Sequence, residues 1–246
     1  MSRSLTTSVT FSNSGSLTVN AGTLQVAKYT QIAGSTTVAK GATLKSGGSG
    51  TQSIIVNGGI VTGNGTLNGA LTGGGTYVPG RSAGALKVSG GFTPTGTATV
   101  LIGLSGSSNP GADFGQLAFT GTATLAGTLA IKTATGYLPP VGATVPIVTA
   151  AKTVGAFSSI TGIQLTGEHW TVSYTSTGVV LIAVQWIEPT GYCQHGNVGS
   201  AKSPLGSEQH CCGPRVERRS QGRQAPSRRK GTVRAHPQAT SAPKTK

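Results

Sequence analysis

The sequence feature that most constrains the fold is a loose repeat of Val, Gly, Thr and Leu in the first three quarters of the chain. Residues 19–24 read VNAGTL, residues 38–44 read VAKGATL and residues 56–61 read VNGGIV, so the leading valines recur at nearly equal steps. Short β-prone runs that end at Gly or Asn and recur in this way are typical of parallel β-helix coils. Because one coil leaves its own apolar face uncovered, each coil must stack on the next.

The composition favours an all-β protein. The 246 residues include 39 glycines, and only 10% are charged, against about 25% in an ordinary globular domain. Thr, Val and Gly suit strands joined by frequent turns. The sequence therefore predicts three or four parallel β-helix coils over residues 1–90. A terminal β-helix or β-cap region with a closing hairpin is expected over 91–186, and a disordered basic tail over 187–246.

Apolar and polar residues alternate within residues 1–78, and this alternation predicts which side chains face the core. We expect the turn at Pro79 to end a strand, because proline donates no ladder hydrogen bond. We expect Trp170, Tyr174 and Phe157 to close the far end of the core. The predicted inward residues of the coils are Leu17, Val19, Leu24, Val26, Ile32, Val38, Leu44, Ile54, Val56, Ile60, Leu67, Leu71 and Val78.

Positive charge is concentrated in the tail. The chain carries a formal net charge of +14, of which residues 187–246 contribute +8 through eleven basic and three acidic residues. Such a segment buries too little apolar area to offset its ordering entropy. It can bind polyanions by releasing counterions, although no aromatic side chains interleave for base stacking. The candidate polyanion contacts are Arg215, Arg218, Arg219, Arg223, Arg228, Arg229, Lys230 and Arg234.

The three cysteines also lie in the tail, and they do not form a convincing metal site. Structural zinc is bound by cysteine pairs in an orderly, short spacing, whereas Cys211 and Cys212 are adjacent and Cys193 stands alone beside His195. We expect no bound metal and no cofactor.

Two sequence patterns could indicate catalysis, and each has a simpler interpretation. Residues 80–84 read GRSAG, which matches the nucleophile elbow of hydrolases, but that motif needs a following helix and the next predicted element is a strand. Asp113 and Glu168 are the two acids before the tail, and glycosidases need two carboxylates that face each other. We expect Asp113 in a loop, Glu168 in the turn before Trp170, and no enzymatic activity.

Residues 77–88 read YVPGRSAGALKV, and residues 114–129 and four shorter runs up to residue 159 follow them. These segments resemble the passenger domains of bacterial autotransporters, which contain autotransporter-associated β-strand repeats. Residues 77–88 are similar to the Pro-Gly-x-Ser-x-Gly-x-Leu-x-Val junction of that family, and the later segments resemble those that follow this junction. The similarity covers about residues 15–184 and implies a right-handed β-helix that is secreted or surface-exposed and involved in adhesion. The basic tail departs from the family, and we expect the chain to be a piece of a longer protein.

These observations predict a non-enzymatic structural or adhesive segment of a secreted or cell-surface bacterial protein. The expected partners are glycans or proteins on a host or neighbouring cell, with self-association through exposed sheet edges and no specific small molecule. Binding of nucleic acid or an anionic surface through the tail is the alternative, with nucleic acid the less favoured of the two. A carbohydrate-active β-helix enzyme is the weaker alternative.

Overall fold

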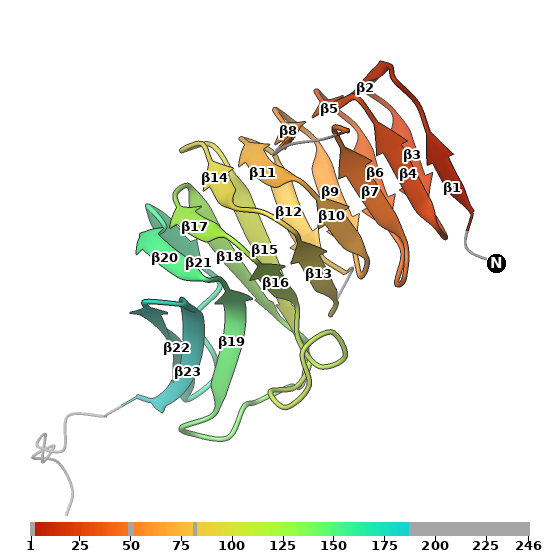
Figure 1. The fold of residues 1–246 in the computed structure, drawn as a ribbon. Coiled ribbons are helices and arrows are strands. Elements are labelled where there is room, and N and C mark those ends of the chain that lie inside the picture. The colour runs from red at the N-terminus through yellow and green to blue at the C-terminus, as the bar shows by residue number, and fades with distance from the viewer. Residues whose placement is uncertain (1–2, 49–51, 81–82, 187–246) are drawn as a thin grey trace, which may run out of the picture. The chain divides into compact units, whose positions relative to one another are not determined.

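The computed structural model describes residues 3–48, 52–80 and 83–186, and these contain 23 β-strands and no helix (Figure 1). The strands form three sheets, named A, B and C here. Sheet A runs in the order β1 (Ser4–Thr6), β4 (Thr23–Val26), β7 (Thr43–Ser46), β10 (Thr66–Asn68), β13 (Ala85–Val88), β16 (Gln116–Phe119), β19 (Thr144–Thr149), β23 (Gly178–Gln185) and β22 (Glu168–Thr175).

The other two sheets have seven strands each. Sheet B consists of β2 (Thr10–Asn13), β5 (Lys28–Gln31), β8 (Ser53–Val56), β11 (Ala70–Gly73), β14 (Phe92–Pro94), β17 (Thr122–Leu125) and β20 (Lys152–Gly155). Sheet C consists of β3 (Ser16–Val19), β6 (Ser35–Val38), β9 (Ile60–Gly63), β12 (Thr76–Pro79), β15 (Thr99–Leu104), β18 (Thr128–Thr133) and β21 (Ser159–Thr161).

Three consecutive strands make one winding, with one strand in each sheet. The neighbouring strands from β1 to β21 pair in parallel, so the described chain makes seven stacked windings (Figure 1). The predicted all-β parallel β-helix is confirmed. The prediction of only three or four windings is wrong, because the same three sheets continue past residue 90, where β13 pairs with β16 and β14 with β17.

The windings become longer along the chain, so a search for a repeat of constant length does not find the later ones. In sheet A, Ser4 pairs with Thr23 in the first winding, whereas Lys87 pairs with Ala118 across a much longer stretch of sequence in a later one. The extra residues lie between strands, so backbone pairing is kept while the sequence period is lost. A winding tolerates such insertions because lengthening a loop adds little closure entropy.

The first two copies of the sequence repeat, at residues 19–24 and 38–44, lie side by side in the structure, and the third copy, at residues 56–61, does not. Val19 pairs with Val38 in sheet C, as the repeat predicts. Val38 then pairs with Gly63, and Val56 lies in sheet B opposite Gln31. The leading valine of the third copy therefore falls in sheet B instead of sheet C. The reason is that the connection from β7 to β8 is longer than the connection from β4 to β5.

Side chains alternate between a buried interior and an exposed outer face along each strand, as expected for period-two geometry. Most of the predicted inward residues are buried. Ile32 and Ile60 are corrections, with 54% and 44% of their surface exposed. In β9 the inward residues are Val61 and Gly63, because Gly63 pairs with the buried Val38. A shift of one residue along a strand turns every side chain to the opposite face.

The same one-residue shift occurs in β12. Val78 is half-buried and faces outward, while its neighbours Tyr77 and Pro79 are buried. Pro79 ends the strand, as its missing N–H predicts. Leu17 and Leu24 are also less buried than predicted, because they belong to the first two windings, where Leu5 of β1 is 64% exposed.

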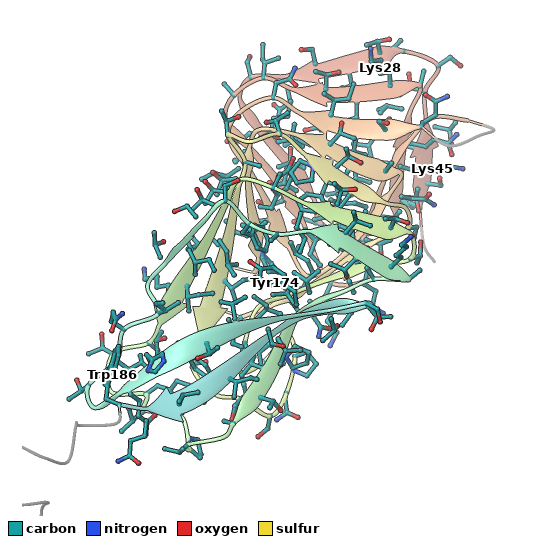
Figure 2. All side chains as sticks on the ribbon, turned by 90° about the vertical axis from the view of Figure 1, so that its left-hand side faces the viewer. Lys28, Lys45, Tyr174 and Trp186 are labelled. Carbon is teal, nitrogen blue, oxygen red and sulfur yellow. The ribbon has the colours of Figure 1, made fainter. Side chains whose placement is uncertain are left out.

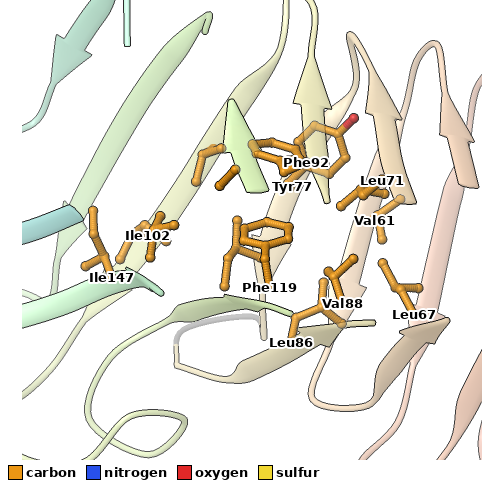
Figure 3. Packing of buried hydrophobic residues seen from close by; sticks show 14 of the residues in the cluster. Val61, Leu67, Leu71, Tyr77, Leu86, Val88, Phe92, Ile102, Phe119 and Ile147 are labelled. Atoms are coloured by element: carbon orange, nitrogen blue, oxygen red, sulfur yellow. The ribbon is translucent and has the colours of Figure 1, made fainter. Parts of the chain in front are cut away.

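Aromatic rings stack along the middle of the interior (Figure 3). The rings of Tyr77 and Phe92 meet edge to face with centroids 5.2 Å apart, and Phe92 stacks on Phe119 at 4.9 Å. The Tyr77 hydroxyl donates a hydrogen bond to the Gly73 carbonyl at 3.1 Å. Burial raises the pKa of Tyr77 well above its ordinary value. These contacts join three consecutive windings through one apolar column.

A polar cluster occupies the interior of the first windings. Asn13 and Gln31 are register partners in sheet B, and both are buried. Asn13 Nδ2 lies 3.3 Å from the hydroxyl oxygens of Tyr29 and Thr36, and the Thr36 hydroxyl donates to Gln31 Oε1. Burial raises the pKa of Tyr29, and hydrogen bonds from Thr36 and Asn13 partly oppose that rise. The cluster satisfies its own polar groups, so it holds adjacent windings in register.

The predicted hairpin is formed by β22 and β23, which pair antiparallel around the turn at Ser176 and Thr177. β23 adds to sheet A by pairing antiparallel with β19. Trp170 of β22 is completely buried. The hairpin therefore closes the C-terminal side of the described interior, as Figure 1 shows next to β19.

Candidate binding surface

The outer face of sheet C carries two rows of short uncharged side chains. Outward positions recur at every second residue of each strand, and the parallel register stacks them from winding to winding. Ten of the fourteen positions are Thr or Ser. The first row is Ser16, Ser35, Ile60, Thr76, Thr99, Thr128 and Ser159, and the second is Thr18, Thr37, Thr62, Val78, Leu101, Ala130 and Thr161.

Charge lies mainly on the other two faces. Outward lysines of sheet A are Lys45 and Lys87, and those of sheet B are Lys28 and Lys152. Figure 2 labels Lys28 and Lys45 on their strands. On sheet C the first outward lysine is Lys132, near the end of β18. Sheet C thus presents no charged side chain from β3 to β15, whereas sheet B carries Lys28 on its second strand and sheet A carries Lys45 and Lys87 on its third and fifth.

The register gives this face a regular geometry. Neighbouring strands lie about 4.8 Å apart, and residues two apart in a strand are separated by roughly 6.7 Å. Each Thr or Ser hydroxyl can donate one hydrogen bond and accept two. A lattice of weak contacts at fixed spacing suits a ligand that itself repeats, because each further contact then forms at high effective concentration.

Two hollows lie at the C-terminal end of this face. One, of about 130 Å³, is lined by Val78, Leu101 and Gly103 and by Lys132. The other, of about 720 Å³, lies between the end of β18, the loop around Tyr137 and residues 162–166. Lys132 and Ala134 line both, so the two hollows are neighbours along one surface.

A third hollow, of about 560 Å³, borders sheet A. Lys40 and Lys87 line it together with Asn64, Thr66 and the loop 110–112. Its two ammonium groups favour an anion. The carboxylate of Asp113, the residue after Ala112, accepts hydrogen bonds from Asn109 and does not line this hollow.

The two acids singled out in the sequence lie in different elements. Asp113 is in the β15–β16 loop, as predicted, and its Oδ2 accepts hydrogen bonds from the backbone N–H and the side-chain amide of Asn109 at 2.9 and 3.1 Å. Glu168 is a correction: it begins β22 instead of lying in a turn, because it pairs with Gln185 of β23. It is buried, and its Oε2 has no hydrogen-bond partner among the described residues.

The segment that matches a nucleophile elbow lies between two strands, β12 and β13, rather than between a strand and a helix. Gly80 has a positive φ of 66°. A Cβ on Gly84 would fall 2.0 Å from Asn64 Oδ1, so this glycine serves close packing. Arg81 and Ser82 lie outside the described residues. The flanking strands favour a turn, as the sequence interpretation expects.

The tail residues lie outside the part of the chain that the structure describes. These are the eight candidate polyanion contacts from Arg215 to Arg234, together with Cys193, Cys211 and Cys212. Among the described residues, no three His, Cys, Asp or Glu side chains gather to hold a metal ion.

The three aromatic residues expected at the end of the core have different environments. Trp170 and Phe157 are buried, with 0% and 7% of their surface exposed. Tyr174 is a correction, since 38% of its surface is exposed and its hydroxyl accepts a hydrogen bond from the Phe157 N–H at 3.3 Å. Trp186 is also exposed and lies against His169, with ring centroids 4.2 Å apart. Figure 2 labels Tyr174 and Trp186 on the hairpin side of the fold.

The residues around the larger of the two sheet C hollows were missed in the sequence. Tyr137 lies in a stretch rich in glycine and proline that predicts only a turn, and Gln164 lies in a connection with no motif. A usable signal was the length of the connection from β18 to β19, which holds Tyr137, since long ordered loops often carry function.

No protein-family model matches the chain, and no curated protein matches it in sequence. Among the residues that the structure describes, no helix has the length and apolarity needed to cross a lipid bilayer.

Proposed function

We propose that this chain is a non-enzymatic adhesive and structural segment of a secreted or surface-exposed bacterial protein of the autotransporter passenger type. The observation that carries the proposal is the uncharged Thr- and Ser-rich outer face of sheet C. A rigid stack of windings holds its hydroxyl groups in register. Such a face makes many weak contacts with a repeating partner such as a cell-surface glycan.

The arrangement of acids supports a non-enzymatic role. Asp113 is held by Asn109 in the β15–β16 loop, and Glu168 is buried in β22. Glycoside hydrolysis uses two carboxylates on opposite sides of one bond. Incubation of the full chain with polysaccharides, followed by measurement of new reducing ends, tests this point. Sustained turnover would contradict the non-enzymatic assignment.

Adhesion is tested with beads that carry the full chain. We expect the beads to adhere to bacterial cells or to films of a neutral polysaccharide such as cellulose. Replacing Thr18 and Thr37, neighbours on sheet C, by lysine should reduce adhesion. The matched control replaces Ser12 and Thr30, neighbours on sheet B, by lysine and adds the same charge. Beads that adhere to no surface, or equal losses in both double variants, would overturn the proposal.

The basic tail supports a second candidate function, the binding of polyanions. Residues 187–246 hold eleven of the 19 basic residues, and such a cluster gains affinity from counterion release. Deletion of residues 187–246 should abolish retention on a heparin column at low salt and leave the β-rich circular dichroism spectrum intact. If retention survives the deletion, the tail is not the polyanion-binding segment.

A further inference from the structure

The hollow of about 720 Å³ at the C-terminal end of sheet C has firmly fixed walls. One wall is the end of β18, next to β21 (Figure 1). Residues 162–166, which follow β21, form a second wall. Gly162 packs so closely on β18 that an added Cβ would fall 1.9 Å from the Ile131 carbonyl oxygen. Backbone hydrogen bonds of 2.8 and 3.0 Å, from Trp170 to Ile163 and from Leu165 to Glu168, tie that wall to β22.

The groups that line this hollow combine an aromatic surface with polar atoms. The half-buried ring of Tyr137 contributes the aromatic surface. Its hydroxyl is enclosed and has no hydrogen-bond partner among the described residues. The side chains of Gln164 and Thr166 add an amide and a hydroxyl group. A small-molecule site typically places a few polar groups around an apolar surface in this way.

The charge of the hollow comes from one lysine. Lys132 is exposed, lines both this hollow and the adjoining smaller one, and faces outward from β18. No acid of the described residues lines either hollow. The two acids in the described part are both placed elsewhere, Asp113 with Asn109 and Glu168 buried in β22. The local field therefore favours a ligand with one negative charge.

We propose that this hollow binds a carboxylate-bearing sugar residue of a surface polysaccharide. The Lys132 ammonium receives the carboxylate, Gln164 and Thr166 bond the ring hydroxyls, and the apolar face of the sugar lies against Tyr137. The neighbouring units of the polysaccharide extend over the two outward rows of sheet C, to which Thr128 and Ala130 of the same strand, β18, belong. This inference rests on the proposed adhesive function and names the ligand class of one subsite.

Titration calorimetry of the full chain tests the subsite with trigalacturonate as the acidic probe and maltotriose as the neutral one. At about 0.15 M salt, where long-range attraction is screened, we expect preferential binding of trigalacturonate. Lys132→Gln should weaken that binding about tenfold, the scale of one charge-assisted hydrogen bond. Lys152→Gln, an exposed lysine on sheet B, is the matched control and should leave affinity unchanged.

Two substitutions of Tyr137 distinguish the contribution of its ring to affinity from that of its hydroxyl group. Tyr137→Phe keeps the aromatic surface and should lower affinity less than Tyr137→Ala. Unfolding midpoints of all variants identify any that fail to fold, and the exposed Lys132→Gln then remains the deciding variant. If Lys132→Gln has no effect, or if Lys152→Gln weakens binding equally, the ligand is held by general positive charge and the subsite is wrong.

The outcome also distinguishes the subsite from the proposed function. Equal affinity for the two trisaccharides would overturn the acidic-sugar assignment. The same holds if neither binds while the beads described above still adhere, and the adhesive role would then stand. Failure of the beads to adhere to any cell or polysaccharide would remove the adhesive role itself, whatever the calorimetry shows.

Discussion

The indole Nε1 of Trp170 donates a hydrogen bond to the Thr133 hydroxyl at a distance of 3.2 Å. Trp170 belongs to β22 of the closing hairpin, and Thr133 ends β18 of sheet C. Because Trp170 is completely buried, this bond satisfies an indole N–H that water cannot reach. The contact therefore joins the hairpin of sheet A to the end of a different sheet and closes the apolar column.

Replacement of Thr133 by valine tests that closure. The change keeps the shape of the side chain but leaves the buried indole N–H without an acceptor, which should lower the free energy of unfolding by about 1–3 kcal/mol. Guanidinium denaturation measures the loss. Thr171→Val, at an exposed position of β22, is the control and should stay within about 0.5 kcal/mol. Equal losses in the two variants would show that the bond contributes nothing specific.

Gly63 tests the close approach between windings. Its φ is 132°, and an added Cβ would fall 2.0 Å from the Val38 carbonyl oxygen. Gly63→Ala should destabilise the protein by more than about 2 kcal/mol, since both backbone strain and steric overlap oppose it. Gly96 has open space at its Cβ position, so Gly96→Ala should be neutral or stabilising by up to about 1 kcal/mol. Urea denaturation of both variants decides the comparison.

We expect the protein to lose stability at alkaline pH because of Tyr77. Burial raises the pKa of its hydroxyl above the unfolded value, which is about 10. The folded protein keeps this proton at a pH where the unfolded chain releases it. The contribution of the protonated Tyr77 hydroxyl to the free energy of unfolding is therefore complete below about pH 10. It falls as the pH rises further, by up to about 1.4 kcal/mol per pH unit.

The variant Tyr77→Phe should flatten this alkaline decline. At neutral pH it loses the hydrogen bond to the Gly73 carbonyl, so it begins less stable by about 1 kcal/mol. Urea midpoints between pH 8 and 11 give the slope for each protein. Part of the decline should remain, because burial also raises the pKa of Tyr29. An unchanged slope would show that Tyr77 does not govern the effect.

We expect copies of this chain to associate through the open strand edges of the first winding. Within the described residues, β1, β2 and β3 have a neighbouring strand on one side only, and Leu5 and Val9 are 64% and 56% exposed. An open strand edge next to apolar side chains is a template for another chain. Sedimentation velocity should show association that grows with concentration, and lysine at both positions should reduce it. A monomer at all concentrations would contradict this expectation.

Local patterns predicted most of the inward side chains of the coils. Val19, Val38 and Leu44 are buried as the alternation of apolar and polar residues predicts. Ile60 and Val61 show the limit of that reasoning. Two adjacent apolar residues fit either face, and the choice follows from the pairing of Gly63 with Val38, which no single strand reveals.

The candidate site was less predictable than the fold. Lys132, Tyr137 and Gln164 come from β18, from the turn after it and from the connection between β21 and β22. Nothing in their spacing marks them as neighbours. The sequence predicted glycans or proteins as partners but did not select a face of the fold. The selection of sheet C follows from the distribution of lysines over the three faces, which depends on the phase of every winding.

The amino-acid sequence by itself determined that this chain forms short strands with one apolar face, separated by glycine-rich turns, and that such strands must stack. Those properties are local, because they depend on alternation and turn chemistry within a few residues. The tertiary structure alone decided how many windings form, which side chains share a row and where the walls of a hollow meet. Connections of unequal length shift the phase of each winding, and only the pairing of distant strands fixes that phase.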